Sequence, residues 1–322
     1  MTKDLELWQF VAGRLDNNVS AMVLVVAESS GSSPGRKGYK MAVGADGDLF
    51  GSLGGGGMEV KLIERCRALL SEPGAVAIGL QQPKLIEQVH QKNSPHASGM
   101  ICSGRQTVVL IPLAPKESQT VYAIIRAMGS PGSELITISH EGLTANPEAK
   151  PGFVKQSETE FTYTERLGKK YELYIIGGGH CALALSEMMS KLDFRITIFD
   201  DRADLNTIEK NRFADEIRII ESYENIGDLV TEGPDVYVVI MTIGYASDEV
   251  AIRGLVDKDI KYLGVLGSSA KMKVLLKSLE KEGIDARLLS RIHTPIGLPI
   301  NSHSPEEIAV SIAAEIISVK NA

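Results

Sequence analysis

Cysteine is scarce in this chain, and its scarcity excludes several kinds of site. The 322 residues include three cysteines, Cys66, Cys102 and Cys181, and no Cys-x-x-Cys pair occurs. A disulfide framework or a structural zinc site is therefore not expected. The six histidines show no metal-ligand spacing, and the zinc-protease pattern His-Glu-x-x-His is missing.

Long apolar runs and basic clusters are missing as well. No apolar run reaches the roughly 18 residues that a membrane span needs. The charged N-terminal segment, residues 1–6, lacks the apolar core of a signal peptide. We therefore expect a cytoplasmic protein that does not enter a membrane. The net charge is −7, and without clustered Lys and Arg the chain is not expected to bind nucleic acid.

Length and patterning predict two globular domains. Residues 141–170 have no clean periodicity and contain Pro147 and Pro151, so we place the boundary there and divide the chain into residues 1–165 and 166–322. The first half mixes helical and strand patterns, which predicts an α+β domain. Its expected helices are residues 3–15, 58–70 and 118–128, and its expected strands are residues 21–27, 40–43, 48–52, 108–112 and 134–139.

The second half alternates strands with helices. This order predicts an α/β fold, a Rossmann-type doubly wound parallel sheet with helices on both faces. The expected strands are residues 171–176, 195–199, 217–220, 236–241 and 262–265. The expected helices are residues 182–191, 226–230, 249–255, 270–281 and 305–319.

A glycine-rich turn follows the first of these strands. Residues 177–182, GGGHCA, fit the pattern G-x-G-x-x-A before a helix. Gly177 permits a tight turn, Gly179 lets a phosphate approach the backbone, and the helix amides favour an anion. His180 is the histidine best placed to touch a ligand, and Asp200 ends the next strand, where an acidic residue bonds a ribose hydroxyl. The alternative is a tight turn without a ligand.

Two further segments are expected at the carboxyl ends of later strands. Gly244 lies in the segment 242–245, and Ser268 and Ser269 lie in a glycine-rich segment before a helix. Ligands of α/β sheets bind at this edge, so all three are candidate binding residues. For Ser268 and Ser269 the alternative is a plain helix cap.

The first half carries its own glycine cluster and a cysteine of interest. Gly54, Gly55 and Gly56 begin a run of four glycines, which indicates a sharp turn or a close approach to another group. A flexible turn is the alternative. Cys102 lies between small residues and Arg105, so it is either an accessible thiolate or a buried inert thiol, and the spacing alone favours the buried thiol.

Segments spread in order over nearly the whole chain resemble the XdhC/CoxI family. They are 31–34 (GSSP), 51–56 (GSLGGG), 99–102 (GMIC), 177–180 (GGGH), 199–202 (FDDR), 263–271 (LGVLGSSAK), 293–298 (HTPIGL) and 305–312 (PEEIAVSI). Two departures stand out. Residues 242–245 read TIGY where the family often has Thr-His-Gly-His, so no role of those histidines carries over. Residues 102–104 read CSG where the family has Cys-Gly-Gly, which keeps the thiol.

The resemblance implies an accessory protein that binds the molybdenum cofactor, molybdopterin or its dinucleotide form, and delivers it to xanthine dehydrogenase or a related molybdenum hydroxylase. Such a protein is a maturation factor rather than an enzyme. It implies Cys102 as a ligand of the cofactor's metal, in keeping with the softness of thiolate. The glycine loop 54–56 and Cys102 would then close over the pterin and the metal, and the turn at 177–180 would hold the phosphate.

The implied partners are the apo-hydroxylase, a cysteine desulfurase that sulfurates the bound cofactor, and a second copy of the chain in a homodimer. One rival hypothesis is an NAD-dependent oxidoreductase that uses the same Rossmann turn. The lack of an evident catalytic acid–base pair disfavours it. A nucleotide-sensing regulator is a third hypothesis, and the lack of a basic DNA-binding helix disfavours it.

Overall fold

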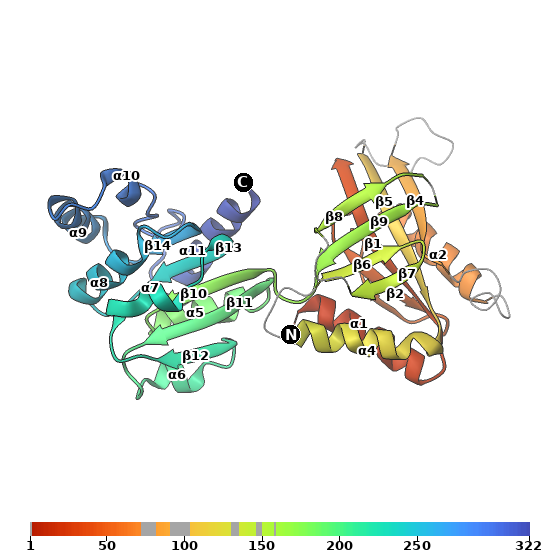
Figure 1. Cartoon of the computed structure of the whole chain (residues 1–322), viewed down its shortest axis with the longest axis horizontal. Coiled ribbons are helices and arrows are strands. Elements are labelled where there is room, and N and C mark those ends of the chain that lie inside the picture. Colours follow the sequence, from red (N-terminus) through yellow and green to blue (C-terminus); the bar gives the residue numbers. More distant parts are fainter. Residues whose placement is uncertain (1, 72–81, 91–103, 130–134, 146–149, 158) are drawn as a thin grey trace. The chain divides into compact units, whose positions relative to one another are not determined.

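The computed structural model describes residues 2–71, 82–90, 104–129, 135–145, 150–157 and 159–322 (Figure 1). The chain forms two compact units, Met1–Gly168 and Lys169–Ala322. The sequence places the boundary between residues 165 and 166. Among the described helices, none is long and apolar enough to cross a membrane.

Unit 1 contains two antiparallel sheets. The first sheet has the strand order β3-β2-β1-β5-β4, and the second has the order β7-β6-β9-β8. The strands of the first sheet are β1 (Ala21–Gly31), β2 (Lys40–Gly44), β3 (Leu49–Gly51), β4 (Lys84–His90) and β5 (Gly104–Leu113). Those of the second are β6 (Leu135–Ser139), β7 (Gly142–Ala145), β8 (Gly152–Lys155) and β9 (Phe161–Arg166).

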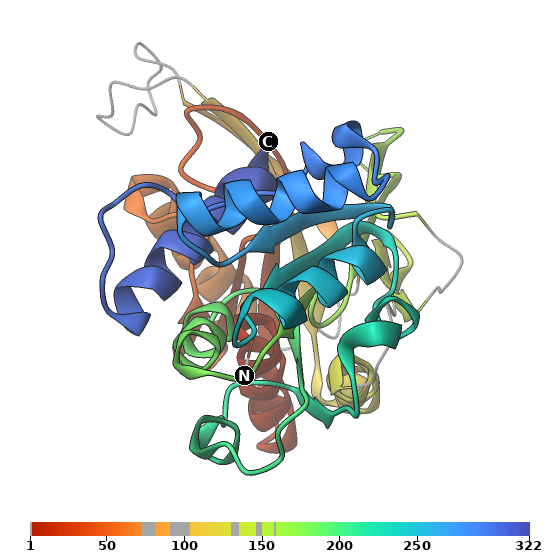
Figure 2. The same cartoon turned by 90° about the vertical axis from the view of Figure 1, so that its left-hand side faces the viewer.

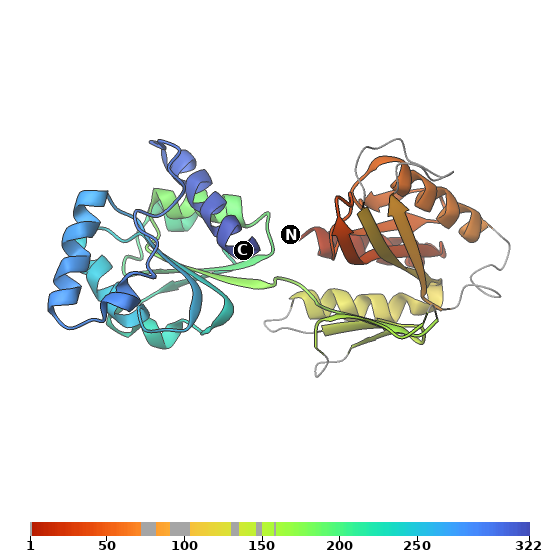
Figure 3. The ribbon, with the colours of Figure 1, turned by 90° about the horizontal axis from the view of Figure 1, so that it is seen from above.

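Residues 21–27 of β1 are buried on both faces, which explains their unbroken apolar sequence. Val23 and Val25 pack in a core with α1 (Lys3–Asp16) and α4 (Ser118–Gly129), whereas Met22 and Leu24 pack against α2 (Gly56–Ser71). Figure 3 shows α2 beside the first sheet and α4 beside the second. A short 3-10 helix, η1 (Pro115–Glu117), leads into α4.

Three strands of unit 1 lie where the sequence predicts no regular structure. Strands β7, β8 and β9 fall within residues 142–166. In β9, polar residues occupy buried positions because each finds a partner. Thr164 shares a hydrogen bond with Thr137 (3.1 Å between the hydroxyl oxygens), and Glu165 forms an ion pair with Lys40 (3.0 Å). The expectation of an irregular segment was therefore wrong here.

Unit 2 is a parallel five-stranded sheet in the order β12-β11-β10-β13-β14, which confirms the predicted Rossmann-type fold. Its strands are β10 (Tyr171–Ile176), β11 (Phe194–Asp200), β12 (Glu216–Ile219), β13 (Gly233–Ile240) and β14 (Ile260–Val265). Its helices are α5 (His180–Met189), α6 (Asn206–Lys210), η2 (Tyr223–Asn225), α7 (Ile226–Leu229), α8 (Tyr245–Leu255), α9 (Ser269–Lys281), α10 (Ala286–Leu289) and α11 (Pro305–Asn321).

Helices cover both faces of this sheet (Figure 2). Helices α5 and α11 pack on one face, and α7 to α10 pack on the other. Strand β11 lies on one side of β10 and β13 lies on the other. The strand order therefore reverses at β10, and the carboxyl ends of β10 and β13 form the edge at which such sheets bind ligands.

Candidate functional site

The turn between β10 and α5 needs glycine at its first two positions. Gly177 has φ +108°, and a Cβ placed there would lie 2.5 Å from the carbonyl oxygen of Met241. A Cβ on Gly178 would lie 2.8 Å from Cγ1 of Ile208. Both contacts are too short, so the first glycine holds the turn against the end of β13 and the second holds it against α6.

Gly179 is different, because the space beside it is open. It is the N-cap of α5 with φ −73°, and a Cβ there would meet nothing within 4 Å. The fold itself would therefore leave room for a side chain at position 179. The amides of the first turn of α5 follow, beginning with the exposed His180. Open space next to helix amides is an arrangement that accepts an anion.

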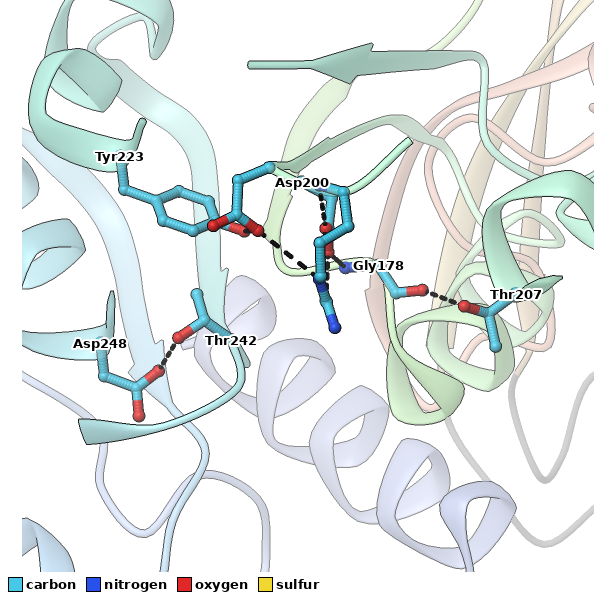
Figure 4. Close-up of polar contacts among 8 residues, drawn as sticks. Gly178, Asp200, Thr207, Tyr223, Thr242 and Asp248 are labelled. Atoms are coloured by element: carbon cyan, nitrogen blue, oxygen red, sulfur yellow. Dashed lines mark hydrogen bonds and ion pairs between the residues drawn. The ribbon is translucent and has the colours of Figure 1, made fainter. Parts of the chain in front are cut away.

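Asp200 lies at the end of β11, next to this turn, and is fully buried. One carboxylate oxygen accepts hydrogen bonds from the amide of Gly178 (2.6 Å) and from Nη2 of Arg202 (2.7 Å) (Figure 4). The other oxygen accepts bonds from the amide and Nε of Arg202 (2.9 and 2.8 Å). Thr207 donates to the carbonyl oxygen of Gly178 (2.5 Å), so both polar groups of Gly178 are held by the protein.

This arrangement differs from the expected role of Asp200 at a ribose. Burial acts to raise the pKa of its carboxyl, but the hydrogen bonds from Arg202 and Gly178 outweigh burial and hold that pKa below its usual value. The carboxylate is charged and already has four donors. A ribose hydroxyl could reach it only after Arg202 had moved.

The ends of β13 and β14 contribute a second polar group of side chains. Asp248 of α8 is fully buried, accepts a hydrogen bond from Thr242 (2.6 Å), and pairs with Nζ of Lys271 in α9 (2.6 Å). Figure 4 shows Thr242 and Asp248 together after β13. Lys271 is partly exposed. Asp248 balances its charge, and this ion pair lies at the edge of the sheet where the phosphate turn also lies.

The three candidate residues at this edge have defined local roles. Gly244 is the N-cap of α8 with φ +107°, and its neighbours Ile243 and Tyr245 are exposed apolar side chains. Ser268 is the N-cap of α9 and accepts a hydrogen bond from the amide of Lys271 (3.3 Å), so it caps the helix as the alternative proposed. Ser269 is the first residue of α9 and is exposed.

The glycine run of unit 1 forms a loop around the carboxylate of Glu59. One oxygen of Glu59 accepts hydrogen bonds from the amides of Leu53 (2.7 Å) and Gly55 (3.1 Å) and from the hydroxyl of Ser52 (2.7 Å). Gly54 has φ +112°, and a Cβ there would overlap the carbonyl oxygen of Pro34. The run therefore makes a sharp turn and a close approach of two chain segments, rather than a flexible loop.

Gly56 follows with φ +77° as the first residue of α2. Nearby, the buried side chain of Gln106 accepts hydrogen bonds from the hydroxyl of Ser33 (2.7 Å) and the amide of Gly35 (3.2 Å). A Cβ on Gly104 would overlap the amide nitrogen of Ser33. Segments 31–35, 52–56 and 104–106 therefore pack together. Cys102 lies outside the described residues.

The other two cysteines are not candidate ligands. Cys66 is a residue of α2 that is buried against the first sheet, and burial raises the pKa of its thiol to about 12, so it is protonated at neutral pH. Burial also raises the pKa of Cys181. Within the described ranges, no group of three or more His, Cys, Asp or Glu side chains could hold a metal ion.

Sequence patterns missed the residues that organise these sites. In the sequence, Arg202 and Lys271 occur only as members of family segments, and Glu59 and Asp248 carry no predicted role. A signal existed for Glu59, because a carboxylate a few residues after a glycine loop can bond the loop amides. No signal in spacing alone could have paired Asp248 with Lys271, which is 23 positions away.

Comparison with known proteins identifies both halves. Residues 173–316 match the family described as the XdhC Rossmann domain, and residues 15–79 match the XdhC and CoxI family. The Escherichia coli protein YqeB is 25% identical over 95% of this chain and 44% of its own length. A Bacillus subtilis protein named as a probable subunit of xanthine dehydrogenase is 28% identical over 51% of this chain and 47% of its own length.

This chain thus spans less than half the length of these two relatives. Among solved structures, one described as a xanthine dehydrogenase from Bacillus halodurans has a TM-score of 0.72 and 24% identity. The match covers 100% of this chain and 96% of that one. At that identity the likeness concerns the fold.

Proposed function

Because this chain belongs to the XdhC/CoxI family, we propose that it is an accessory protein that binds the molybdenum cofactor and delivers it to xanthine dehydrogenase or a related molybdenum hydroxylase. The name of the Bacillus subtilis relative, a probable xanthine dehydrogenase subunit, supports a link to that system. The accessory role is the broader part of the proposal. Cofactor delivery is the specific part and depends on the site.

The proposal rests on one observation about this turn: the space beside Gly179 is open, while the carboxylate of Asp200 is occupied by hydrogen bonds within the protein. The turn offers helix amides and free space to a phosphate. The acidic residue that would bond a nucleotide ribose has its hydrogen bonds satisfied within the protein. A phosphate monoester such as that of molybdopterin needs only the open turn. NAD, or the dinucleotide form of the cofactor, would also call for a free acidic partner at its ribose.

The side chains around the turn fit the rest of such a ligand. Lys271, which pairs with Asp248 and is partly exposed, is a hydrogen-bond donor at the same edge of the sheet, and Ile243 and Tyr245 offer apolar surface beside Gly244. A planar ring can pack on such side chains. When bound, the cofactor supplies the molybdenum centre that the client enzyme uses. The residues of this chain bind the phosphate, cover the ring and exclude water.

In this proposal Cys102 remains the candidate ligand of the metal, and Gly54, Gly55 and Gly56 remain candidates to cover the pterin. Their support is the family motif and the chemistry of thiolate. His180, Ser268 and Ser269 stay candidates for contacts to the phosphate. A cysteine desulfurase, the apo-hydroxylase and a second copy of this chain remain the proposed partners, and co-purification from cells would test each.

The rival hypothesis, an NAD-dependent oxidoreductase, rests on the Rossmann turn. The two hypotheses differ in the ligand that accompanies the gently purified protein. Mass spectrometry should detect molybdopterin for the accessory protein and a nicotinamide for the oxidoreductase. A nicotinamide without any pterin would refute our proposal.

The decisive variant is Gly179→Val, because it places a side chain where the phosphate would approach. We expect it to keep the fold, since the space is open, and to lower the molybdenum and pterin content at least about tenfold, the effect of losing a hydrogen bond to a charged group. Gly152→Val is the matched control, because a Cβ at Gly152 also meets nothing within 4 Å. It lies in β8 of unit 1 and should retain the cofactor.

Cys102→Ser separates the metal from the phosphate. The variant should still bind the pterin phosphate but retain less molybdenum per protein, because a hydroxyl replaces thiolate poorly at a soft metal. If Cys102→Ser carries as much molybdenum as the parent protein, the assignment of Cys102 is wrong. If Gly179→Val does so, the phosphate site is wrong.

A further inference from the structure

A cavity of about 320 Å³ lies in unit 2, beside the amino-terminal half of β14. Apolar side chains, among them Leu255 and Leu263, form part of its wall. Its basic lining residues are Lys258, Lys261, Arg291 and His293. Among the lining residues no Asp or Glu occurs. Four basic groups therefore gather at one cavity in a protein whose net charge is −7.

The cavity is separate from the phosphate turn. The turn follows the carboxyl end of β10, whereas Lys258 precedes β14 and Lys261 is its second residue. Because the strands are parallel, these places lie at opposite edges of the sheet. The family motif at residues 293–298 begins at this cavity, and the proposed cofactor site gives that motif no role.

The backbone explains why there is space here. Strand β14 is at the edge of the sheet. The segment after α10 runs along its outer side, where the amide of His293 donates to Leu263 (2.9 Å) and the amide of Val265 donates to His293 (3.0 Å). These bonds cover the carboxyl-terminal half of β14. The cavity lies beside the earlier residues of β14, to which this segment makes no backbone hydrogen bond, and residues 290–293 form part of its lining.

Two of the four basic groups have no structural partner. Lys258 pairs with Glu232 (3.6 Å) and follows the end of α8, where a cation is favoured, so the fold accounts for it. The Nδ1 atom of His293 lies 3.6 Å from a carboxylate oxygen of Glu315, so the fold accounts for this side chain as well. The side chains of Lys261 and Arg291 are exposed, and no hydrogen bond or ion pair holds either of them within the described part of the chain. Two free cations beside a cavity are what an anionic ligand needs.

We propose that this cavity binds a small organic anion that carries a phosphate group, with Lys261 and Arg291 on the phosphate and the mainly polar lining on the rest of the molecule. Its volume lies at the lower end of the range for ligand sites, so a molecule of the size of a nucleoside monophosphate fits. Arg supplies the forked donor pattern suited to phosphate. This proposal is independent of the cofactor site.

The test is calorimetry of the whole chain with AMP and, separately, with inorganic phosphate. The Gly179→Val variant is the background, because it removes binding at the phosphate turn. We expect AMP to bind this variant more tightly than inorganic phosphate does. Adding Lys261→Gln and Arg291→Gln together should weaken AMP binding about tenfold or more, because two charged donors are lost.

Lys277→Gln is the control, since Lys277 is an exposed lysine of α9 that does not line the cavity. It should leave AMP binding unchanged. Photo-crosslinking with an azido derivative of AMP should label peptides that contain residues 255–263 or 288–293. The proposal is overturned if AMP does not bind, if the double variant binds like its parent, if inorganic phosphate binds as tightly as AMP, or if only the turn peptide is labelled.

Discussion

Asp200→Asn is the most informative change in this chain, because it asks whether that residue serves the fold or the ligand. The substitution keeps the shape of the side chain but removes its charge. Its amide group can accept from Gly178 through one oxygen. Its NH2 group replaces the oxygen that accepts from the amide and Nε of Arg202, so two of the four native hydrogen bonds are lost.

The magnitude follows from burial and from these bonds. Asp200 is fully buried, while the side chain of Arg202 is 31% exposed and can turn toward water once it is released. The loss is therefore smaller than the roughly 3–5 kcal/mol for breaking a fully buried pair. It is larger than one neutral hydrogen bond of about 1 kcal/mol. We expect Asp200→Asn to lower the free energy of unfolding by about 2–3 kcal/mol.

The acid dependence gives an independent check. The hydrogen bonds of Asp200 lower its pKa in the folded protein below the value of a free aspartate, so its charged form stabilises the fold. That contribution is fully present above the unfolded pKa and is lost as the pH falls below about 4 through the folded pKa. Urea unfolding at neutral pH and at about pH 3.5 should therefore separate wild type from Asp200→Asn most clearly at neutral pH.

Arg202→Gln is the companion variant. It should cost less stability than Asp200→Asn, because Asp200 keeps the amides of Gly178 and residue 202 as donors. If Asp200→Asn unfolds like the wild type yet loses only ligands that contain a ribose, the carboxylate binds ligand and our account of this turn is wrong.

Four other substitutions test the architecture of unit 1. Lys40→Met should lower the free energy of unfolding by about 3–5 kcal/mol in urea titrations, because it leaves the buried Glu165 without its cation. Asp4 and Glu165 raise the pKa of Lys40 despite its burial. The stabilisation by Lys40 is therefore present at neutral pH and is lost only above about pH 10.5. Gly54→Ala should lower the free energy of unfolding by about 2–4 kcal/mol, because Gly54 has a positive φ and a Cβ there would overlap the backbone of Pro34. Gly55→Ala should lower it by only about 1–2 kcal/mol, because Gly55 has φ +78° but open space beside it. Equal melting temperatures of the two variants would contradict this difference. Cys66→Ser should cost about 1–3 kcal/mol by burying a hydroxyl, and an unchanged melting temperature would show that the hydroxyl finds a partner there.

The fold of unit 2 could be predicted because its strands other than β12 are short, mainly apolar runs between helical patterns. In a parallel sheet covered on both faces, burial alone dictates that sequence. In unit 1 the same reasoning found β1 and β5 but failed for β8, whose residues are half-buried or exposed. An edge strand with little buried surface has no apolar period to detect. Strand β9 was missed because its buried polar residues depend on partners far away in the sequence.

The candidate site could be located from sequence but not interpreted fully. The turn at 177–180 follows from its glycines and its place after a strand. The role of Asp200 does not, because an acidic residue at the end of β11 can face either a ligand or the turn itself. The carboxylate of Asp200 faces the turn because Arg202 and the amide of Gly178 donate hydrogen bonds to it, and the positions of both donors depend on the folded backbone.

In each of the two glycine-rich turns, a carboxylate of the protein itself accepts hydrogen bonds from backbone amides of the turn. In unit 1 this is Glu59, which holds the amides of Leu53 and Gly55. A negative charge already occupies the place where that loop could bind an anion, so a phosphate there would meet repulsion. In the turn of unit 2, the carboxylate of Asp200 accepts a hydrogen bond only from the amide of Gly178, and the space beside Gly179 stays open. We therefore expect a phosphate to bind at the second turn and not at the first. Glu59→Gln should then loosen the loop of unit 1 without creating a phosphate site, and phosphate binding gained by that variant would refute this division.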